Sequence, residues 1–198
     1  MYSNRIAEGQ RALARKAKAQ GKKFQGRDRP IEQVTGIVLH QMGFTRGDAI
    51  EKYFPVTAHF VIAPNGDTAQ LHGLEESLWS SNALNKFTCA VEFAGNFRND
   101  KGRWWRGGGE DRLTTAQIVA GRDLLRQVAS SYGIRHVYAH RQGAGKNKSN
   151  CCGPEIWYEV AEWACENGIY ENTSYEFYGA GSCIPASWIV YQKKEQGE

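Results

Sequence analysis

Short apolar runs separated by polar turns recur through the first half of the chain. The run "TGIVLH", residues 35–40, predicts a buried strand that ends in a histidine. Residues 57–63 predict another strand, and "PNGD" directly after them predicts a tight turn into a returning strand. The run "FTCAVEFAG" alternates as a strand does, with Cys89, Val91 and Phe93 on one face and Ala90 and Glu92 on the other.

The second half changes to a helical period and then alternates between strand and helix. "TTAQIVAGRDLLRQVASSYG" opens with a threonine cap, carries apolar residues at helical spacing and ends at Gly133, so it predicts a helix. "HVYAH" predicts a strand over 136–140, and the segment from Pro154 to Gly168 predicts a second helix. This alternation predicts a single α/β domain with a mixed central sheet, helices flanking it, and a cleft at the strand ends.

The composition is that of a globular protein without a membrane span. Of 198 residues, 41% are hydrophobic and 23% are charged, which suits one domain with its own core. No apolar run approaches the length that a bilayer requires, and no apolar segment follows the basic N-terminus as in a secretory signal. We therefore expect synthesis in the cytoplasm without an export signal. Five cysteines, an odd number, favour a reducing compartment or a metal site over a disulfide framework.

Positive charge is concentrated at the N-terminus. Residues 1–29 hold nine lysines and arginines against two acidic residues, a net charge of +7 in a chain whose total is +4, so the remainder carries −3. We expect residues 1–30 to form a basic arm, which is either solvated and partly disordered or an electrostatic tether to an anionic polymer. Residues 31–170 then form the functional domain, and the aromatic-rich residues 171–198 form an extension that packs on it or trails from it.

Two histidines and a cysteine lie where functional groups gather in α/β proteins. His40 and His140 each end a predicted strand, and Cys151 follows on a basic, glycine-rich loop. If the two strands are neighbours, both imidazoles face one cleft and the cysteine can reach it. Two imidazoles and a thiolate form a zinc site with a fourth position open to water, whose pKa the metal would lower from about 16 towards 7. A Cys/His nucleophile pair and ordinary structural residues are the alternatives.

Glu92 is a carboxylate in the otherwise apolar run "CAVEFAG". Burying a carboxylate is unfavourable unless it has a partner or faces a cleft. Glu92 is therefore either a structural group, in a salt bridge or at a sheet edge, or a general base for a metal-activated water. The other three histidines, His59, His72 and His136, are expected to be structural or exposed.

Several longer segments follow one another along residues 34–166: "GIVLHQMG", "TAHFVIAPNGDTAQL", "LWSSNALNKFTCAVEFAGNF", "LTTAQIVAGRDLLRQVASSYG", "YAHRQ" and "KSNCCGPEIW". In this order they resemble the type-2 N-acetylmuramoyl-L-alanine amidases. That zinc-dependent family includes phage lysozyme-amidases, cytoplasmic muropeptide amidases and animal peptidoglycan recognition proteins. The resemblance implies an amidase-like domain over residues 31–170, with a zinc cleft at the strand ends.

The resemblance also implies roles for the candidate residues. His40 and His140 match the two histidine ligands of the zinc ion. Counting back from Trp157 places Cys151, rather than its neighbour, on the third ligand. Glu92 matches the glutamate that several members use in catalysis.

Three positions depart from the family's pattern. Ala58 stands where members often have a tyrosine, just before the hairpin histidine. Residues 80–82, Ser-Ser-Asn, replace the usual His-Ala-Gly and imply a different shape of the substrate cleft. A lysine or arginine commonly lies two residues before the third ligand. Ser149 occupies that position here, so Lys148 is the candidate for stabilising the oxyanion.

The function that these expectations describe is zinc-dependent cleavage of the amide between N-acetylmuramic acid and the L-alanine of the peptidoglycan stem peptide. A phage or prophage endolysin, or a toxin released by a dedicated secretion apparatus, fits a bacteriolytic chain without an export signal, and a cytoplasmic recycling enzyme stays open. A peptidoglycan-binding module of the same fold and a Cys/His thiol peptidase are the alternatives. We expect peptidoglycan or muropeptide as the partner, no nucleic acid, and a monomer.

Overall fold

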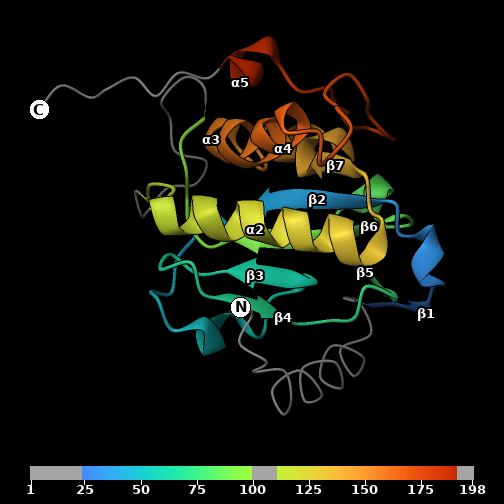
Figure 1. Cartoon of the computed structure of the whole chain (residues 1–198), viewed down its shortest axis with the longest axis horizontal. Coiled ribbons are helices and arrows are strands. Elements are labelled where there is room, and N and C mark those ends of the chain that lie inside the picture. The colour runs from blue at the N-terminus through green and yellow to red at the C-terminus, as the bar shows by residue number, and fades with distance from the viewer. Residues whose placement is uncertain (1–23, 100–110, 191–198) are drawn as a thin grey trace, which may run out of the picture.

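A five-stranded mixed β-sheet forms the centre of the molecule, in the strand order β4-β3-β6-β2-β7 (Figure 1). The computed structural model describes residues 24–99 and 111–190. The strands of this sheet are β2 (Gly36–Gln41), β3 (Phe60–Ile62), β4 (Thr68–Gln70), β6 (Thr88–Phe93) and β7 (His136–Ala139). The β3–β4 pair is antiparallel, whereas β3, β6, β2 and β7 are parallel. A separate antiparallel pair consists of β1 (Phe24–Asp28) and β5 (Glu76–Leu78).

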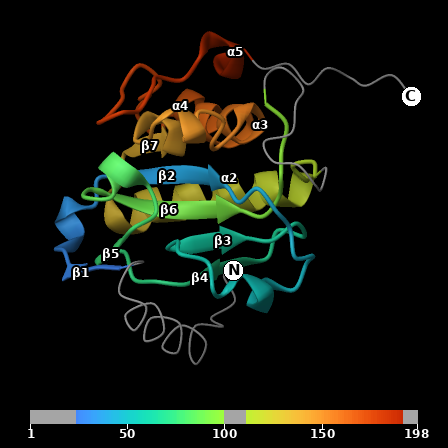
Figure 2. The same cartoon turned by 180° about the vertical axis from the view of Figure 1, so that it is seen from behind.

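One long helix, α2 (Thr115–Tyr132), lies across one face of the sheet, in front of the strands in Figure 1 and behind them in Figure 2. Thr114 caps its N-terminus: the hydroxyl accepts the N–H of Gln117, and the Gln117 side chain accepts the N–H of Thr114. The helix ends at Gly133, whose φ of 67° suits a residue without a Cβ. The predicted helix is confirmed at both ends, and with the mixed sheet it confirms the α/β fold.

The second predicted helix exists but is not regular. It consists of α3 (Pro154–Ile156), a π-helical stretch over Trp157–Glu162, and α4 (Trp163–Glu166). The buried indole of Trp157 donates its N–H to Glu162 Oε2 at 3.2 Å, a partner five residues further on. A π-helix has backbone hydrogen bonds between residues i and i+5, so its turns are wider than those of an α-helix. The apolar pattern predicted a regular helix because spacing in the sequence does not resolve one locally widened turn.

The side chains of the central strands point alternately to the two faces of the sheet. On one face, strand side chains pack against α2 and the α3–α4 segment and form the main hydrophobic core. It includes Ile37, Leu39, Cys89, Val91, Phe93 and Val137 from the strands, and Leu125 and Trp157 from the helices. The intervening residues point to the opposite face, where Val38 packs with Leu84 and Tyr138. His40 and Glu92 belong to this second face by strand alternation. The alternation predicted for β6 is thus confirmed, and it directs the polar residues away from the helices.

The strand predicted over 57–63 is shorter than expected, because β3 covers only Phe60–Ile62. The imidazole of His59 takes part in the sheet instead: its Nδ1 accepts the N–H of Ala90 at 3.0 Å. Its Nε2 then carries the proton and donates to the carbonyl of Glu76 at 2.9 Å. Burial lowers the pKa of His59 to about 3, so the ring stays neutral and bridges β6 and β5. His59 is therefore structural, as predicted.

Arg29, which the sequence groups with the basic arm, lies inside the folded domain. Its side chain is buried, and the guanidinium donates to the backbone carbonyls of Leu74, Asn85 and Thr88. A guanidinium has five N–H donors in a rigid fork, and these three acceptors allow its charge to be buried. The folded part of the chain thus begins before residue 31. Of the predicted arm, residues 24–28 form β1, and residues 1–23 lie outside the described residues.

Replacing Arg29 by methionine is expected to lower the free energy of unfolding by about 3 kcal/mol or more, because three buried carbonyls lose their donor. The urea midpoint measures this change. Arg126→Ala is the control, since the Arg126 side chain is 53% exposed and its ion pair with Asp123 is worth less than about 1 kcal/mol. An Arg29 variant that unfolds at the parent's urea concentration would contradict the structural role.

The segment after residue 170 packs against the turn that follows His140. The side-chain amide of Gln142, in that turn, donates to the carbonyls of Thr173 at 2.6 Å and Glu176 at 3.0 Å. Trp188, in α5 (Ala186–Ile189), is buried, and the Arg141 guanidinium lies 4.9 Å from the centre of its ring. Sequence patterns assigned no role to this segment. Its contacts help to hold the His140 turn in place.

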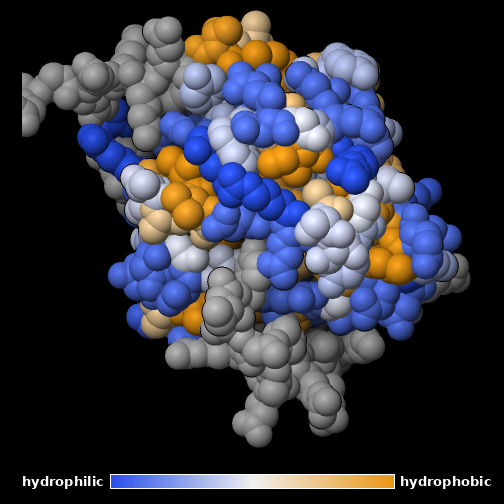
Figure 3. Space-filling model, viewed as in Figure 1, coloured by the Kyte–Doolittle hydropathy of each residue, from blue (hydrophilic) through white to orange (hydrophobic). Residues whose placement is uncertain are grey.

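The outer face of α2 is largely hydrophilic. Figure 3, drawn from that side, shows polar side chains over most of the face, with separate hydrophobic patches between them.

Within residues 24–99 and 111–190, no helix combines the length and the apolar character that crossing a bilayer would need.

Candidate metal centre

Three neighbouring parallel strands bring polar side chains to the same end of the sheet. β2 lies between β6 and β7, and parallel strands present their carboxyl ends at one edge. His40, the next-to-last residue of β2, pairs in register with Glu92 of β6. His140 directly follows the last residue of β7. The two imidazole centroids lie 4.4 Å apart. The strands that carry the two histidines are therefore neighbours, which is the condition under which both imidazoles can face one cleft.

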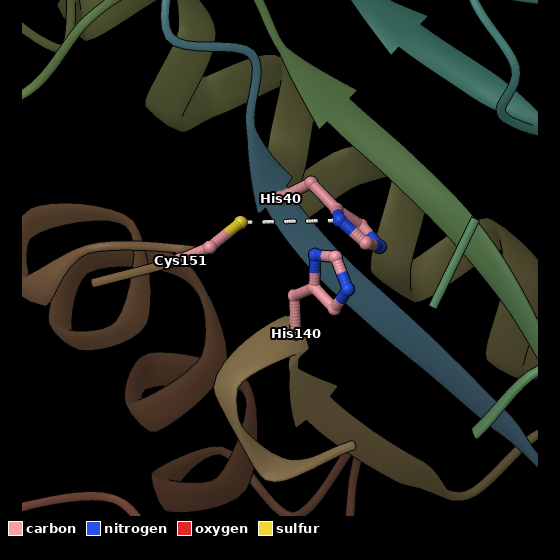
Figure 4. Close-up of side chains that lie close together, drawn as sticks. All are labelled: His40, His140 and Cys151. Atoms are coloured by element: carbon pink, nitrogen blue, oxygen red, sulfur yellow. Dashed lines mark hydrogen bonds between the residues drawn. The ribbon is translucent and has the colours of Figure 1, made fainter. Parts of the chain in front are cut away.

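The thiol of Cys151 joins the two imidazoles in one buried cluster (Figure 4). Its Sγ lies 3.9 Å from His40 Nδ1. One ligand atom from each of His40, His140 and Cys151 lies within 4.8 Å of the other two. Cys152 belongs instead to the hydrophobic core between the sheet and the helices. The fold thus brings together the three predicted ligands and separates the two adjacent cysteines.

The loop that carries Cys151 is held by the residues that follow each histidine. Gln41 Nε2 donates to the carbonyl of Asn150 at 2.8 Å. The backbone N–H of Arg141 donates to the carbonyl of Cys151 at 2.7 Å, and its guanidinium donates to that of Ser149. These bonds fix the cysteine against both strands. A binding site on such supported elements is formed before any ligand arrives.

Burial determines the protonation of the cluster. It lowers the pKa of His140 to about 3, and the positive charge of Lys148 acts in the same direction. The pKa of His40 is also well below its usual value, through burial first and the neighbouring His140 second. Burial raises the pKa of the Cys151 thiol, and the charge of Glu92 raises it further. The free cluster therefore holds neutral imidazoles and a protonated thiol, which would lose its proton on binding a cation.

The chemistry of this donor set suits zinc. Imidazole nitrogen and thiolate sulfur are ligands of the borderline-soft Zn²⁺ ion, whereas Mg²⁺ and Ca²⁺ take oxygen ligands. Three protein ligands leave a tetrahedral ion with one open position, which is typical of catalytic rather than structural zinc sites. The three buried side chains therefore fit a catalytic zinc ion.

Glu92 and Lys148 lie beside the cluster. Glu92 Oε1 is 3.9 Å from His40 Nδ1, and its side chain is 18% exposed. Lys148 is half-buried in the 3₁₀ turn Lys146–Lys148, and its positive charge contributes to the lowered pKa of both histidines. A carboxylate can accept a proton here, and an ammonium group can stabilise developing negative charge.

The structure shows where two of the departures from the family's pattern lie and what they contact. Ala58 is fully buried and offers no hydroxyl. Ser81 and Asn82 hydrogen-bond His40 and His140, their partners lying 41 and 58 residues away in the chain. Sequence reasoning treated residues 80–82 as a change of cleft shape and missed this role. No local pattern could have revealed it, because the contacts arise only in the folded chain.

The remaining histidines are engaged elsewhere. His72 Nδ1 lies 3.2 Å from Glu76 Oε2. His136 begins β7, at the end opposite to His140, and its Nδ1 lies 3.7 Å from Glu171 Oε2. The His136 side chain is 33% exposed, and so half-buried, and it lies away from the cluster, as expected of a histidine outside the site.

Comparison with known proteins identifies one family. A sequence profile described as N-acetylmuramoyl-L-alanine amidase matches residues 30–154, more than half of the chain. Among curated proteins, no sequence gives a significant match.

Several solved structures share the fold. Endolysin N-acetylmuramoyl-L-alanine amidase LysCS from Clostridium intestinale URNW is 16% identical, with a TM-score of 0.50 over 70% of this chain and 90% of that one. AmpDh3 from Pseudomonas aeruginosa, in complex with anhydromuramic pentapeptide, is 20% identical, with a TM-score of 0.51 over 75% of this chain and 64% of that one. Bumblebee PGRP-SA is 12% identical, with a TM-score of 0.56 over 71% and 87%. At these identities the similarity establishes the fold alone.

Proposed function

Because the chain belongs to the N-acetylmuramoyl-L-alanine amidase family, we propose that it hydrolyses peptidoglycan at the amide between N-acetylmuramic acid and L-alanine. The observation that carries the proposal is the convergence of His40, His140 and Cys151 beside the carboxylate of Glu92. The complex of AmpDh3, a protein of similar fold, with anhydromuramic pentapeptide supports a muropeptide as the kind of ligand. The proposed place of action is the bacterial cell wall.

His40, His140 and Cys151 would hold a zinc ion through two nitrogens and one sulfur. When bound, zinc acts as a Lewis acid that lowers the pKa of water and polarises a carbonyl group. Hydrogen bonds hold the loop that carries the cysteine: Gln41 donates to the carbonyl of Asn150, and the N–H of Arg141 donates to the carbonyl of Cys151. These bonds keep the three ligands in place. The site therefore needs little rearrangement to take up the ion.

Glu92 and Lys148 would serve the reaction itself. The Glu92 carboxylate, beside the ligand cluster, takes the proton of the attacking water. It then returns this proton to the amino group of L-alanine, which needs one as the carbon–nitrogen bond breaks. Lys148 places positive charge near the oxyanion that forms on the carbonyl oxygen.

A Cys/His thiol peptidase is less well supported by the site. A nucleophilic cysteine requires a lowered thiol pKa. Burial and the charge of Glu92 raise the pKa of Cys151 instead.

A binding module that does not cleave is the second candidate, because Ala58 lacks the hydroxyl found in many members. The complete donor set and Glu92 favour catalysis over binding alone.

The proposal is tested by metal analysis and by an assay for newly exposed L-alanine amino termini, on purified sacculi and on soluble muropeptides. We expect one zinc per chain, loss of activity after treatment with a chelator, and recovery on adding zinc. His40→Ala should lose both metal and activity, while His136→Ala, at the other end of the sheet, should keep both. Full activity without metal would contradict the zinc mechanism. Binding without cleavage by the zinc-loaded protein would identify a binding module.

A further inference from the structure

Each of the two candidate histidine ligands makes a hydrogen bond through its Nε2 atom. His140 Nε2 lies 2.7 Å from Asn82 Oδ1, and His40 Nε2 lies 3.0 Å from Ser81 Oγ. These partners are consecutive residues at the start of a 3₁₀ turn, Asn82–Leu84. One short segment therefore contacts both imidazoles.

The chemistry of these contacts determines which ring nitrogen carries the proton. An amide oxygen accepts but does not donate, so Asn82 Oδ1 requires that His140 Nε2 carry the hydrogen. In a neutral ring the other nitrogen, Nδ1, then has the free lone pair that a metal needs. The Ser81 hydroxyl can accept from His40 Nε2 in the same way while donating to Ser80 Oγ at 3.3 Å. Nδ1 of His40 is the atom that faces the Cys151 sulfur.

We propose that Ser81 and Asn82 are positioning residues, which fix both histidines in the Nε2–H tautomer and so direct both Nδ1 atoms to one metal ion. The inference rests on the proposed metal site, and it adds residues that set its geometry. A histidine ligand that donates its second N–H to a fixed acceptor is held in both tautomer and ring orientation. The Ser-Ser-Asn segment, which departs from the family's usual sequence here, thereby gains a function.

The turn is itself anchored to both ligand-bearing strands, so it can act as a rigid support. The N–H of Ala83 donates to the carbonyl of Gly143, in the turn after His140, at 3.1 Å. Leu84 is fully buried against Val38 of β2 and Tyr138 of β7. A side chain at Gly143 would place its Cβ 2.7 Å from Leu84 Cγ, so only glycine permits this close approach. The acceptors are thus fixed relative to the strands that carry both rings.

A purely local explanation of Asn82 must be separated from this one. Asn82 has a φ of 54°, in the left-handed region that asparagine, aspartate and glycine tolerate better than other residues. It could therefore be present only for its backbone. Asn82→Gly keeps that backbone conformation and removes the acceptor, whereas Asn82→Asp keeps both. The two variants separate the two explanations.

The test measures two quantities at neutral pH. Long-range ¹H–¹⁵N spectra of the histidine rings in the metal-free protein report each tautomer, and competition with a chelator reports the zinc Kd. We expect parent His140 to be the Nε2–H form. Asn82→Gly should mix its tautomers and weaken zinc binding about 10- to 100-fold, as loss of a ligand's hydrogen-bond partner does. Asn82→Asp should restore both. Ser81→Ala should mix the tautomers of His40 and weaken zinc binding, and it should leave the His140 tautomer unchanged.

The outcomes distinguish this inference from the proposed function. If Asn82→Gly keeps the parent tautomer and the parent zinc Kd, Asn82 serves only its turn and the inference is overturned. If Ser81→Ala leaves the His40 tautomer unchanged, the serine half is overturned. A parent protein that binds no zinc would refute the proposed function, while the spectra of the metal-free protein would still decide the tautomers.

Discussion

Replacing Glu92 by glutamine is expected to leave a folded, zinc-loaded protein that cleaves peptidoglycan about a hundredfold to ten-thousandfold more slowly, the usual effect of losing a general base. Glutamine is nearly isosteric and can still hydrogen-bond, so the strand and the ligand cluster should be preserved. The physical basis is the position of the carboxylate, whose Oε1 lies 3.9 Å from His40 Nδ1 at the end of β6. The release rate of L-alanine amino termini, zinc content and thermal unfolding are measured together.

A matched control is available at the other end of the sheet. Glu171 contacts His136 at the start of β7, and its side chain is 69% exposed, so Glu171→Gln should cleave at close to the parent rate. If Glu92→Gln also cleaves at nearly the parent rate, Glu92 is not the base. If it unfolds while the control does not, the carboxylate holds the sheet together, and the mechanism requires another proton acceptor.

Replacing Cys151 by serine is expected to remove zinc and activity together. Loss of a residue that merely orients a ligand weakens metal binding by about 10- to 100-fold, so loss of the sulfur ligand itself should exceed about a hundredfold. The sulfur lies 3.9 Å from His40 Nδ1 and within the three-residue donor cluster. Zinc Kd by chelator competition and the amino-terminus assay test this expectation.

Cys152→Ser is the natural control, because the two cysteines are adjacent but point to different places. Cys152 packs in the hydrophobic core, so a serine hydroxyl there should lower the free energy of unfolding by about 1 to 3 kcal/mol while zinc and activity are retained. The opposite result, with zinc lost only from the Cys152 variant, would mean that the cysteine assignment is wrong by one residue. That assignment came from counting back from Trp157, and the fold independently places the Cys151 sulfur beside His40.

Local patterns in the sequence were sufficient for most of the fold. The limits of α2 follow from Thr114, Gln117 and Gly133, all of which act on their own turn of the helix. The inward and outward faces of β6 follow from strict alternation along one strand. These features were predictable because each depends on residues a few positions apart. The shortened β3 was not, since the imidazole of His59 bonds to β6 and β5, which lie elsewhere in the sequence. The π-helical stretch was not either, because a pattern of apolar positions does not resolve one widened turn.

The sequence by itself determined which residues carry suitable chemistry: two histidines at strand ends, a cysteine on the following loop and a carboxylate in an apolar strand. Only the tertiary structure decided that His40 and Cys151, 111 residues apart, lie in one buried cluster. It also decided that Arg29 belongs to the domain and that Ser81 and Asn82 hold the imidazoles. The reason is physical: side-chain identity and local period are properties of the chain, whereas cross-strand neighbours and loop paths are set by the packing of the whole sheet.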